Sequence, residues 1–206
     1  MTEAAAPTPS QPVPSNWNLP NALTMLRIVL VPFFIWFFLA DGGAYSWWRW
    51  AAVLLFLVAI YTDKLDGDIA RSRGLITSFG KIADPIADKL LIGSALIMLS
   101  AVGELWWWVT IVMLVREFGI TLLRFVVIRY GVMAASKGGK LKTVLQTIAI
   151  FLYLLPVTPA VPWLSVVALV IMLAALAVTV VTGVDYVVKA VQLRNSGRSS
   201  RTNGAG

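Results

Sequence analysis

The sequence contains no cysteine and no histidine. Without cysteine the chain has no disulfide, no thiol nucleophile and no cysteine-bound metal. Without histidine it lacks the commonest neutral-pH base and the commonest metal ligand. Charge is also scarce, because Asp, Glu, Lys and Arg make up 13% of the chain against about 25% in an ordinary soluble domain. Polar chemistry must therefore depend on a few Asp, Glu, Lys and Arg side chains and on water.

Apolar residues, in contrast, make up 59% of the chain, and its mean hydropathy is +0.82. They form long runs separated by short polar connections, and a run of roughly 20 apolar residues is long enough to cross a bilayer. We therefore predict an all-α, polytopic membrane protein with six transmembrane helices. The predicted helices cover residues 23–39, 47–71, 78–102, 105–130, 141–155 and 163–193.

Both ends of the chain differ from this apolar middle. Residues 1–17 are rich in Ala, Pro, Ser and Thr, and residues 195–206 are polar and basic, so neither stretch can bury enough apolar surface to fold. We predict two disordered tails around one membrane domain of residues 18–194. A cleaved signal peptide is an alternative for the first apolar run, which is longer than such signals usually are.

The basic residues are distributed unevenly among the predicted connections. Residues 41–46, 103–104 and 156–162 contain no Lys or Arg, whereas the other two connections and the C-terminal end contain several. Because positive residues remain on the cytoplasmic side, both termini and the second and fourth connections are predicted to be cytoplasmic, in the cell (inner) membrane. The net charge of +7 does not indicate nucleic-acid binding, because the 17 basic residues are scattered between apolar runs.

Five of the ten acidic residues lie between positions 63 and 88. Asp63 and Asp66 are three residues apart and end one predicted helix, whereas Asp84 and Asp88 are four apart and begin the next. Each pair therefore projects from one helix face, and all four carboxylates can converge at one depth. Close anions repel each other, and a divalent cation such as Mg²⁺, which prefers oxygen ligands, would relieve that repulsion. The pattern predicts a metal site.

An alternative is that these acids form buried ion pairs with Lys64, Lys81 and Lys89. Small residues among the acids favour a binding site instead. Gly67 and Gly80 remove a side chain where helices or a nucleotide could approach closely, despite a helix-propensity cost of about 1 kcal/mol. Ala70 is also small, and Arg71 either binds a donor phosphate or extends to the membrane interface.

These residues resemble the signature of the CDP-alcohol phosphatidyltransferase family, D-x2-D-G-x2-A-R, eight residues, then G-x3-D-x3-D, between Asp63 and Asp88. The resemblance implies the CDP-alcohol phosphotransferase fold, a cytoplasm-facing active site, contact with membrane lipids and a homodimer. It implies two Mg²⁺ or Mn²⁺ ions held by Asp63, Asp66, Asp84 and Asp88, with Asp88 as the catalytic base. It also implies a CDP site formed by Asp66, Gly67, Ala70, Arg71 and Gly80.

Three further stretches resemble the bacterial phosphatidylglycerophosphate synthases within that family: residues 18–34, 115–118 and 139–143. The resemblance implies that the hydroxyl of sn-glycerol 3-phosphate attacks CDP-diacylglycerol and expels CMP. An anionic acceptor requires cations, so we predict a phosphate pocket formed by Arg116, Lys137, Lys140 and Lys142. Alternatively, the lysines only set the topology and contact anionic lipid headgroups.

Three other functions are compatible with parts of this pattern. A member of the same family could use inositol phosphate, serine or another alcohol as acceptor. A divalent-cation transporter could use the same aspartates, but both acidic pairs lie toward one membrane face and no polar relay crosses the other half. A prenyltransferase would also hold pyrophosphate through Asp-bound Mg²⁺, but its two separate aspartate-rich motifs are not found.

Overall fold

A computed structural model describes residues 18–75, 77–127 and 137–202. Within these ranges every regular element is an α-helix, which confirms the all-α prediction. The helices are α1 (Leu19–Asp41), α2 (Trp47–Ser72), α3 (Ser78–Ala101), α4 (Trp107–Val127), α5 (Lys137–Leu154) and α6 (Pro162–Thr202). The structure extends α6 past residue 195, where the sequence predicted the start of a disordered tail. Residues 1–17 lie outside the described ranges, so the division into tails and membrane domain stays a prediction.

Local sequence signals account for several helix ends. Asn18 caps α1 by accepting a hydrogen bond from the backbone N–H of Asn21 at 2.9 Å, and the Thr77 hydroxyl accepts one from Gly80 N at 3.0 Å at the start of α3. After α1, Gly42 adopts a φ of 57°, a left-handed conformation that glycine accommodates without strain. The two caps place polar side chains at the same end of the bundle.

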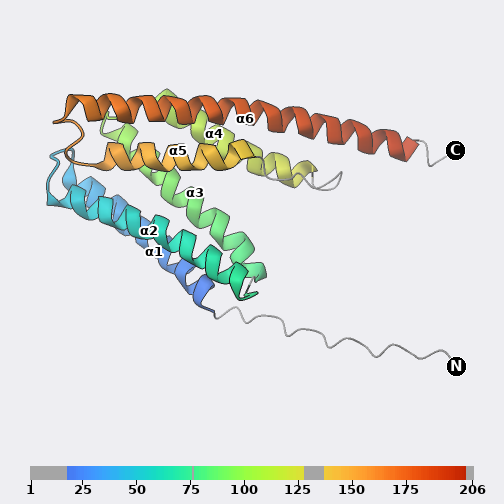
Figure 1. Ribbon diagram of the computed structural model, residues 1–206, viewed down its shortest axis with the longest axis horizontal. Helices are drawn as coiled ribbons and strands as arrows, with labels where there is room; N and C mark the ends of the chain where they lie inside the picture. Colours follow the sequence, from blue (N-terminus) through green and yellow to red (C-terminus); the bar gives the residue numbers. More distant parts are fainter. Residues whose placement is uncertain (1–17, 76, 128–136, 203–206) are drawn as a thin grey trace.

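Figure 1 shows two arms that meet at one end and part at the other. The antiparallel pair α1 and α2 forms one arm, and α5 and α6 run side by side in the other. α3 crosses between the arms and contacts α1, α2, α4 and α5, while α4 packs on α6. The short loops after α1, α3 and α5 gather at the joined end. The parted end carries the start of α1, the end of α2 and the start of α3.

A buried arginine connects the helix ends where the arms join. Arg49 donates from Nε to the carbonyl of Leu154 at 3.0 Å and from Nη2 to the carbonyl of Tyr153 at 3.1 Å. The same guanidinium pairs with Glu104 and lies 4.1 Å from the centre of the Phe38 ring. Burial raises the pKa of Glu104 above its ordinary value, although the charge of Arg49 opposes the rise. One arginine thus ties together α2, the α3–α4 loop and α5.

The polarity of surface and interior is inverted relative to a water-soluble protein. Ile82, Val115 and Val181 are 67%, 66% and 68% exposed, whereas Arg27 and Arg49 are 0% exposed. Large exposed apolar residues occur on all six of the described helices. Such a surface is stable against lipid rather than water. The chain is therefore a membrane protein.

By length and composition, α1 and the Pro162–Gln192 part of α6 qualify as candidate membrane spans within the described residues. In the other four helices, every stretch of 18 residues carries at least three charged residues. Many of these charges lie in polar networks between helices, where ionisable groups in membranes are usually found. The count of six spans stays a prediction.

Candidate functional site

Helix α1 joins the acidic residues of α2 at the parted end of the bundle. Arg27, fully buried on α1, places Nη1 2.6 Å from Oδ1 of Asp63, and its Nη2 donates to Oδ2 of Asp66. Asp66 is almost completely buried, whereas the Asp63 side chain is 49% exposed. Arg27 was not predicted as a site residue, although a lone arginine in the first apolar run was a usable signal. Its guanidinium is a cation that contacts both of these acids.

Thr24, one turn before Arg27, connects the acids of α2 with those of α3. Its hydroxyl oxygen lies 2.6 Å from Oδ1 of Asp84, 3.3 Å from Oδ2 of Asp66 and 3.1 Å from the carbonyl of Pro20. A hydroxyl has one proton, so the shortest contact identifies Asp84 as its main acceptor. The structure therefore brings Asp63, Asp66 and Asp84 together around one face of α1.

Close packing of α1 on α3 depends on a glycine. The Thr77 hydroxyl donates to Oδ1 of Asn21 at 3.0 Å, and a Cβ added at position 80 would lie 2.9 Å from that same oxygen. Real Cβ atoms essentially never approach other atoms so closely. Gly80 therefore permits the approach of two helices, which is one of the two reasons the sequence suggested for a small residue here.

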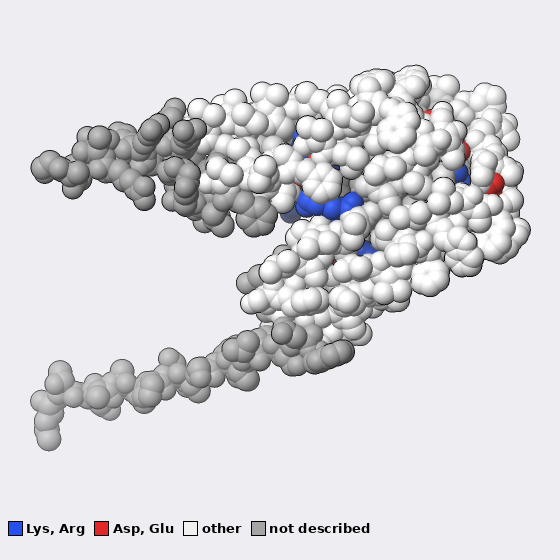
Figure 2. All heavy atoms as spheres, turned by 180° about the vertical axis from the view of Figure 1, so that it is seen from behind, with Lys and Arg blue, Asp and Glu red and all other residues white. Residues whose placement is uncertain are grey.

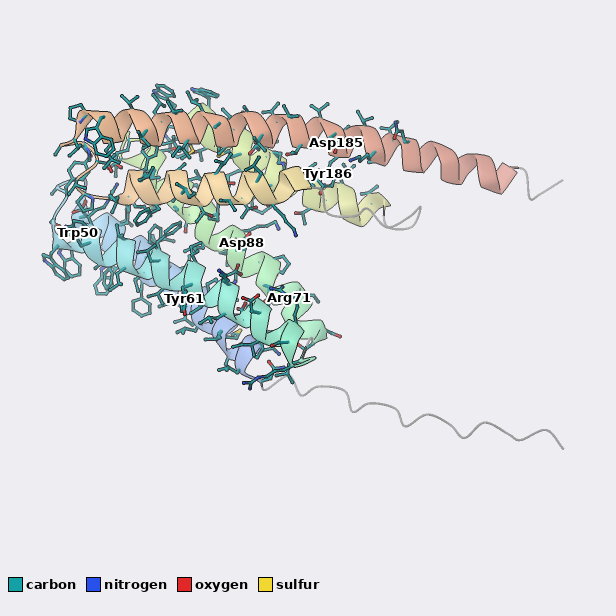
Figure 3. All side chains as sticks on the ribbon, viewed as in Figure 1. Trp50, Tyr61, Arg71, Asp88, Asp185 and Tyr186 are labelled. Atoms are coloured by element: carbon teal, nitrogen blue, oxygen red, sulfur yellow. The ribbon has the colours of Figure 1, made fainter. Side chains whose placement is uncertain are left out.

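Arg71 lies near the far end of α2, toward the parted end of the bundle (Figure 3). Its side chain, 69% exposed, pairs with Asp68 at 2.7 Å and folds back over Gly67, where an added Cβ would lie 3.2 Å from Nη1. Ala70 is half-buried beside it. Of the predicted CDP-binding residues on α2, Arg71 is thus exposed, Gly67 and Ala70 are half-buried, and Asp66 is buried among the acids.

Asp88, one turn after Asp84, is within electrostatic range of Asp63 and also faces charged groups of α4 and α5. It lines a small cavity together with Glu117 of α4 and Lys142 of α5. A second pocket of about 260 Å³ shares Glu117 and Lys142 with this cavity and is also lined by Arg116 and Lys140. Asp88 therefore lies next to a basic pocket. Figure 2 shows lysine and arginine side chains gathered in the hollow where the arms part.

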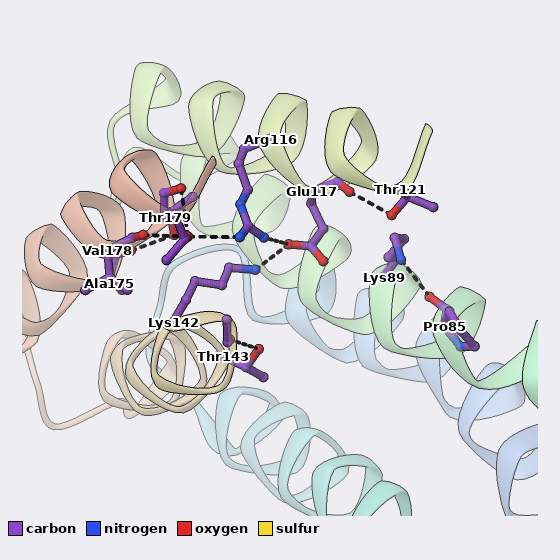
Figure 4. Close-up of polar contacts among 12 residues, drawn as sticks. Pro85, Lys89, Arg116, Glu117, Thr121, Lys142, Thr143, Ala175, Val178 and Thr179 are labelled. Carbon is purple, nitrogen blue, oxygen red and sulfur yellow. Dashed lines mark hydrogen bonds and ion pairs between the residues drawn. The ribbon is translucent and has the colours of Figure 1, made fainter. Parts of the chain in front are cut away.

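Glu117 organises the cations of the larger pocket (Figure 4). Its Oε2 accepts a hydrogen bond from Nζ of Lys142 and lies 3.4 Å from Nη1 of Arg116. Arg116 also donates from Nη2 to the Thr182 hydroxyl at 3.0 Å, and a Cβ added at Gly183 would lie 3.3 Å from its side chain. The network joins α4, α5 and α6.

Of the predicted acceptor-phosphate residues, Arg116, Lys140 and Lys142 line one pocket, whereas the side chain of Lys137 lies outside those described. Glu117, Lys89 and Thr182 were not predicted as members of the network around this pocket, and Lys89 was considered only as an ion-pair partner of the signature acids. Glu117 directly follows Arg116 in the chain and was the signal available, since an acid in an apolar run needs a partner.

The sequence also allowed the signature aspartates to form ion pairs with nearby lysines. Among the described side chains, neither Lys64 nor Lys89 forms an ion pair with the signature aspartates, and Lys89 instead donates to the Pro85 carbonyl at 3.5 Å. The side chain of Lys81 is not among those described. A buried ion pair does form, but its cation is Arg27 from a helix distant in sequence.

The donor chemistry of this region suits a hard divalent cation. Asp63, Asp66, Asp84 and Asp88 present carboxylate oxygens from two neighbouring helices, and oxygen is the ligand that Mg²⁺ and Mn²⁺ prefer. In the arrangement described for residues 18–75, 77–127 and 137–202, no three acids stand together in the geometry of a metal site. The guanidinium of Arg27 contacts one oxygen of Asp63 and one of Asp66 in this arrangement.

Comparison with known proteins places this architecture in context. The family model described as CDP-alcohol phosphatidyltransferase matches residues 17–181. The chain is 52% identical over 175 residues to a probable phosphatidylglycerophosphate synthase of Mycobacterium tuberculosis, which covers 85% of this chain and 82% of that protein. It is 41% identical over 156 residues to a CDP-diacylglycerol–glycerol-3-phosphate 3-phosphatidyltransferase of Bacillus subtilis, covering 69% of this chain and 79% of that protein. A protein of the same name from Escherichia coli K12 is 37% identical over 141 residues, covering 66% and 75%.

Proposed function

The chain belongs to the CDP-alcohol phosphatidyltransferase family, and we propose that it transfers the phosphatidyl group of CDP-diacylglycerol to sn-glycerol 3-phosphate. The products would be phosphatidylglycerophosphate and CMP, in phospholipid synthesis. The names of the relatives from Bacillus subtilis and Escherichia coli state both substrates, and the name of the relative from Mycobacterium tuberculosis states the product. None of these relatives is named as a cation transporter or a prenyltransferase.

The observation that carries this proposal is the position of Asp88 on a cavity shared with Glu117 and Lys142. This position sets a carboxylate beside cations suited to the acceptor's phosphate. Asp88 would accept the proton of the acceptor hydroxyl as that oxygen forms its bond to the phosphorus attached to diacylglycerol. The bond from this phosphorus to the CMP oxygen breaks, and CMP leaves with the electron pair.

On the donor side, Asp63, Asp66, Asp84 and Asp88 would hold divalent metal, which we propose to be two Mg²⁺ or Mn²⁺ ions. Bound metal would neutralise charge developing on the leaving CMP. Gly67, Ala70, Arg71 and Gly80 would border the CDP group together with Asp66. Arg71 suits this role because its exposed guanidinium can leave Asp68 for a phosphate at little cost.

On the acceptor side, Arg116, Lys140 and Lys142 would bind the phosphate of glycerol 3-phosphate, with Lys137 completing the set. Glu117 now holds Lys142 and Arg116 close together. A carboxylate between two cations limits their mutual repulsion when no phosphate is present. The same arrangement keeps both donors directed into a pocket of about 260 Å³.

We place the parted end of the bundle at the cytoplasmic face of the cell (inner) membrane, with six spans and both chain termini on that side. The distribution of Lys and Arg supports this orientation. Exposed Trp47 and Trp107 at the joined end would lie in the opposite interface. A homodimer in contact with membrane lipids also belongs to the proposal, from the resemblance to the family.

The decisive test is CMP release by purified protein supplied with CDP-diacylglycerol and sn-glycerol 3-phosphate. CMP should appear only with both substrates and with Mg²⁺ or Mn²⁺, and chelation by EDTA should stop it. Parallel reactions contain inositol phosphate or serine as acceptor. Product from either of these acceptors but not from glycerol 3-phosphate would refute the choice of acceptor. Absence of CMP under all conditions would refute the proposed enzymatic activity.

A further inference from the structure

Arg27 supplies the aspartate cluster with a cation that belongs to the protein. Its side chain is fully buried, and its guanidinium contacts Asp63 and Asp66 at the same time. A guanidinium remains charged at any pH that a folded protein experiences. The positive charge at this place is therefore permanent.

Without that charge, the acids would be unstable as neighbours. Asp66 and Asp84 share the Thr24 hydroxyl, so their carboxylates lie close together in a largely buried region. Carboxylates in such surroundings repel each other, and each gains stability from an opposite charge. Arg27 satisfies Asp66 on one side and Thr24 satisfies Asp84 on the other, so the cluster can fold before any metal is present.

The contacts of Arg27 also have a consequence for metal binding. The guanidinium takes Oδ1 of Asp63 and Oδ2 of Asp66, oxygens of the same carboxylates that the proposed metal site requires. A divalent cation and a guanidinium cannot use the same oxygens with full strength. The two positive groups also repel each other across a short distance.

We propose that Arg27 is a positioning residue that acts as the internal counter-ion of the aspartate cluster and competes with divalent metal for Asp63 and Asp66. The proposal rests on the metal site of the proposed function. Arg27 holds the acids in place while the site is free of metal and weakens the binding of metal when it arrives. A purely structural arginine would stabilise the fold without changing metal affinity.

The test is a titration of purified protein with Mn²⁺ in the absence of substrates, with free Mn²⁺ measured by electron paramagnetic resonance. Arg27→Gln should bind Mn²⁺ about tenfold more tightly than wild type, because one positive charge has left the site. Arg73→Gln is the matched control, because Arg73 is exposed just after α2 and its replacement removes an equal charge from the same end of the bundle. Its Mn²⁺ affinity should stay within about twofold of wild type, because solvent and salt screen an exposed charge.

Thermal unfolding of the same samples provides a second measurement. Metal-free Arg27→Gln should melt at a lower temperature than wild type, and Mn²⁺ should raise its melting temperature by more than it raises that of wild type. Arg27→Lys covers the case in which Arg27→Gln does not fold. A lysine retains the charge but cannot bridge two carboxylates as a guanidinium does, so this variant should bind Mn²⁺ a few-fold more tightly than wild type.

The proposed competition between Arg27 and metal would be overturned if folded Arg27→Gln bound Mn²⁺ no more tightly than wild type. The same result for Arg27→Lys would overturn it where only that variant folds. Wild-type protein that binds no Mn²⁺ would overturn it as well. Wild type that binds Mn²⁺ but releases no CMP would refute the proposed function and leave the competition intact. The two proposals therefore fail separately.

Discussion

Two arginines are fully buried, Arg49 in the first turn of α2 and Arg27 in the third turn of α1, and their surroundings differ in charge. Arg49 at the joined end pairs with one acid, Glu104, and donates its other hydrogen bonds to backbone carbonyls. Arg27 at the parted end contacts two acids, Asp63 and Asp66, and a third is reached through Thr24. A further buried acid near Arg49, Asp41, accepts hydrogen bonds from the Ser46 hydroxyl and from the backbone N–H groups of Tyr45 and Ser46. Around Arg27, in contrast, three carboxylates share one guanidinium and one hydroxyl.

This difference separates a structural role from a functional one. A balanced buried pair needs no further ligand, and it connects the helix ends it contacts. Excess acids in a poorly solvated place are unfavourable unless a cation binds there. We therefore expect mutations near Arg49 to change stability and mutations among the signature aspartates to change activity.

Asp88→Asn tests the functional end of this comparison and should have the largest effect. CMP release should fall about 10²- to 10⁴-fold, the usual contribution of a positioned base, because asparagine cannot accept the proton. The melting temperature should change little, since removing one acid from an excess of acids leaves no cation unpaired. Initial rates and thermal unfolding on the same preparation check both expectations. Retention of more than a tenth of the activity would argue against Asp88 as the base.

Arg49→Met tests the structural end. We expect the protein to lose about 3–5 kcal/mol of stability, because Glu104 is left as an uncompensated buried charge. Denaturant or thermal unfolding in detergent measures the loss, and CMP release per folded molecule should stay near that of wild type. The double variant with Glu104→Gln should recover part of the stability. Full stability of the single variant, or a selective loss of activity, would contradict the assignment.

Lys142→Ala tests whether the basic pocket at the functional end binds the acceptor substrate and not the donor substrate. Removing a charged hydrogen-bond donor should cost about 1.5–3 kcal/mol of acceptor binding, which raises the KM for glycerol 3-phosphate about 10- to 100-fold. The KM for CDP-diacylglycerol should hardly change. Lys64→Ala is the control, because Lys64 is exposed and lines neither of the two polar cavities. An equal rise in both KM values would indicate that Lys142 does not select the acceptor.

Gly80→Ala should have the smallest effect, since it disturbs the α1–α3 contact without removing a charge. The added Cβ would lie 2.9 Å from Oδ1 of Asn21, so either α1 or the buried Asn21 side chain must shift, at a cost of about 1–3 kcal/mol. A lower melting temperature and weaker Mn²⁺ binding would report the shift. Gly119→Ala, where the Cβ meets no atom within 4 Å, should be neutral or slightly stabilising. Equal behaviour of the two variants would contradict the close approach at Gly80.

The sequence by itself determined the class of protein, the helices and the family. Apolar runs define membrane helices through local composition, and the spacing of Asp63, Asp66, Asp84 and Asp88 is a one-dimensional pattern that needs no contact to be recognised. The predicted ends of the first three helices, the start of the fourth and the end of the fifth agree with the structure to within a few residues, whereas the connection between the fourth and fifth helices lies outside the described residues. These features are local, so the chain order alone contains them.

Only the tertiary structure decided which charges meet. Arg27 and Asp66 are 39 residues apart, and Arg49 and Leu154 are 105 apart. Both arginines read alike in the sequence, as single charges near or within apolar runs. Their different roles depend on how many acids the packing of other helices brings to each. Such contacts form only when distant segments fold together, and local patterns carry no record of them.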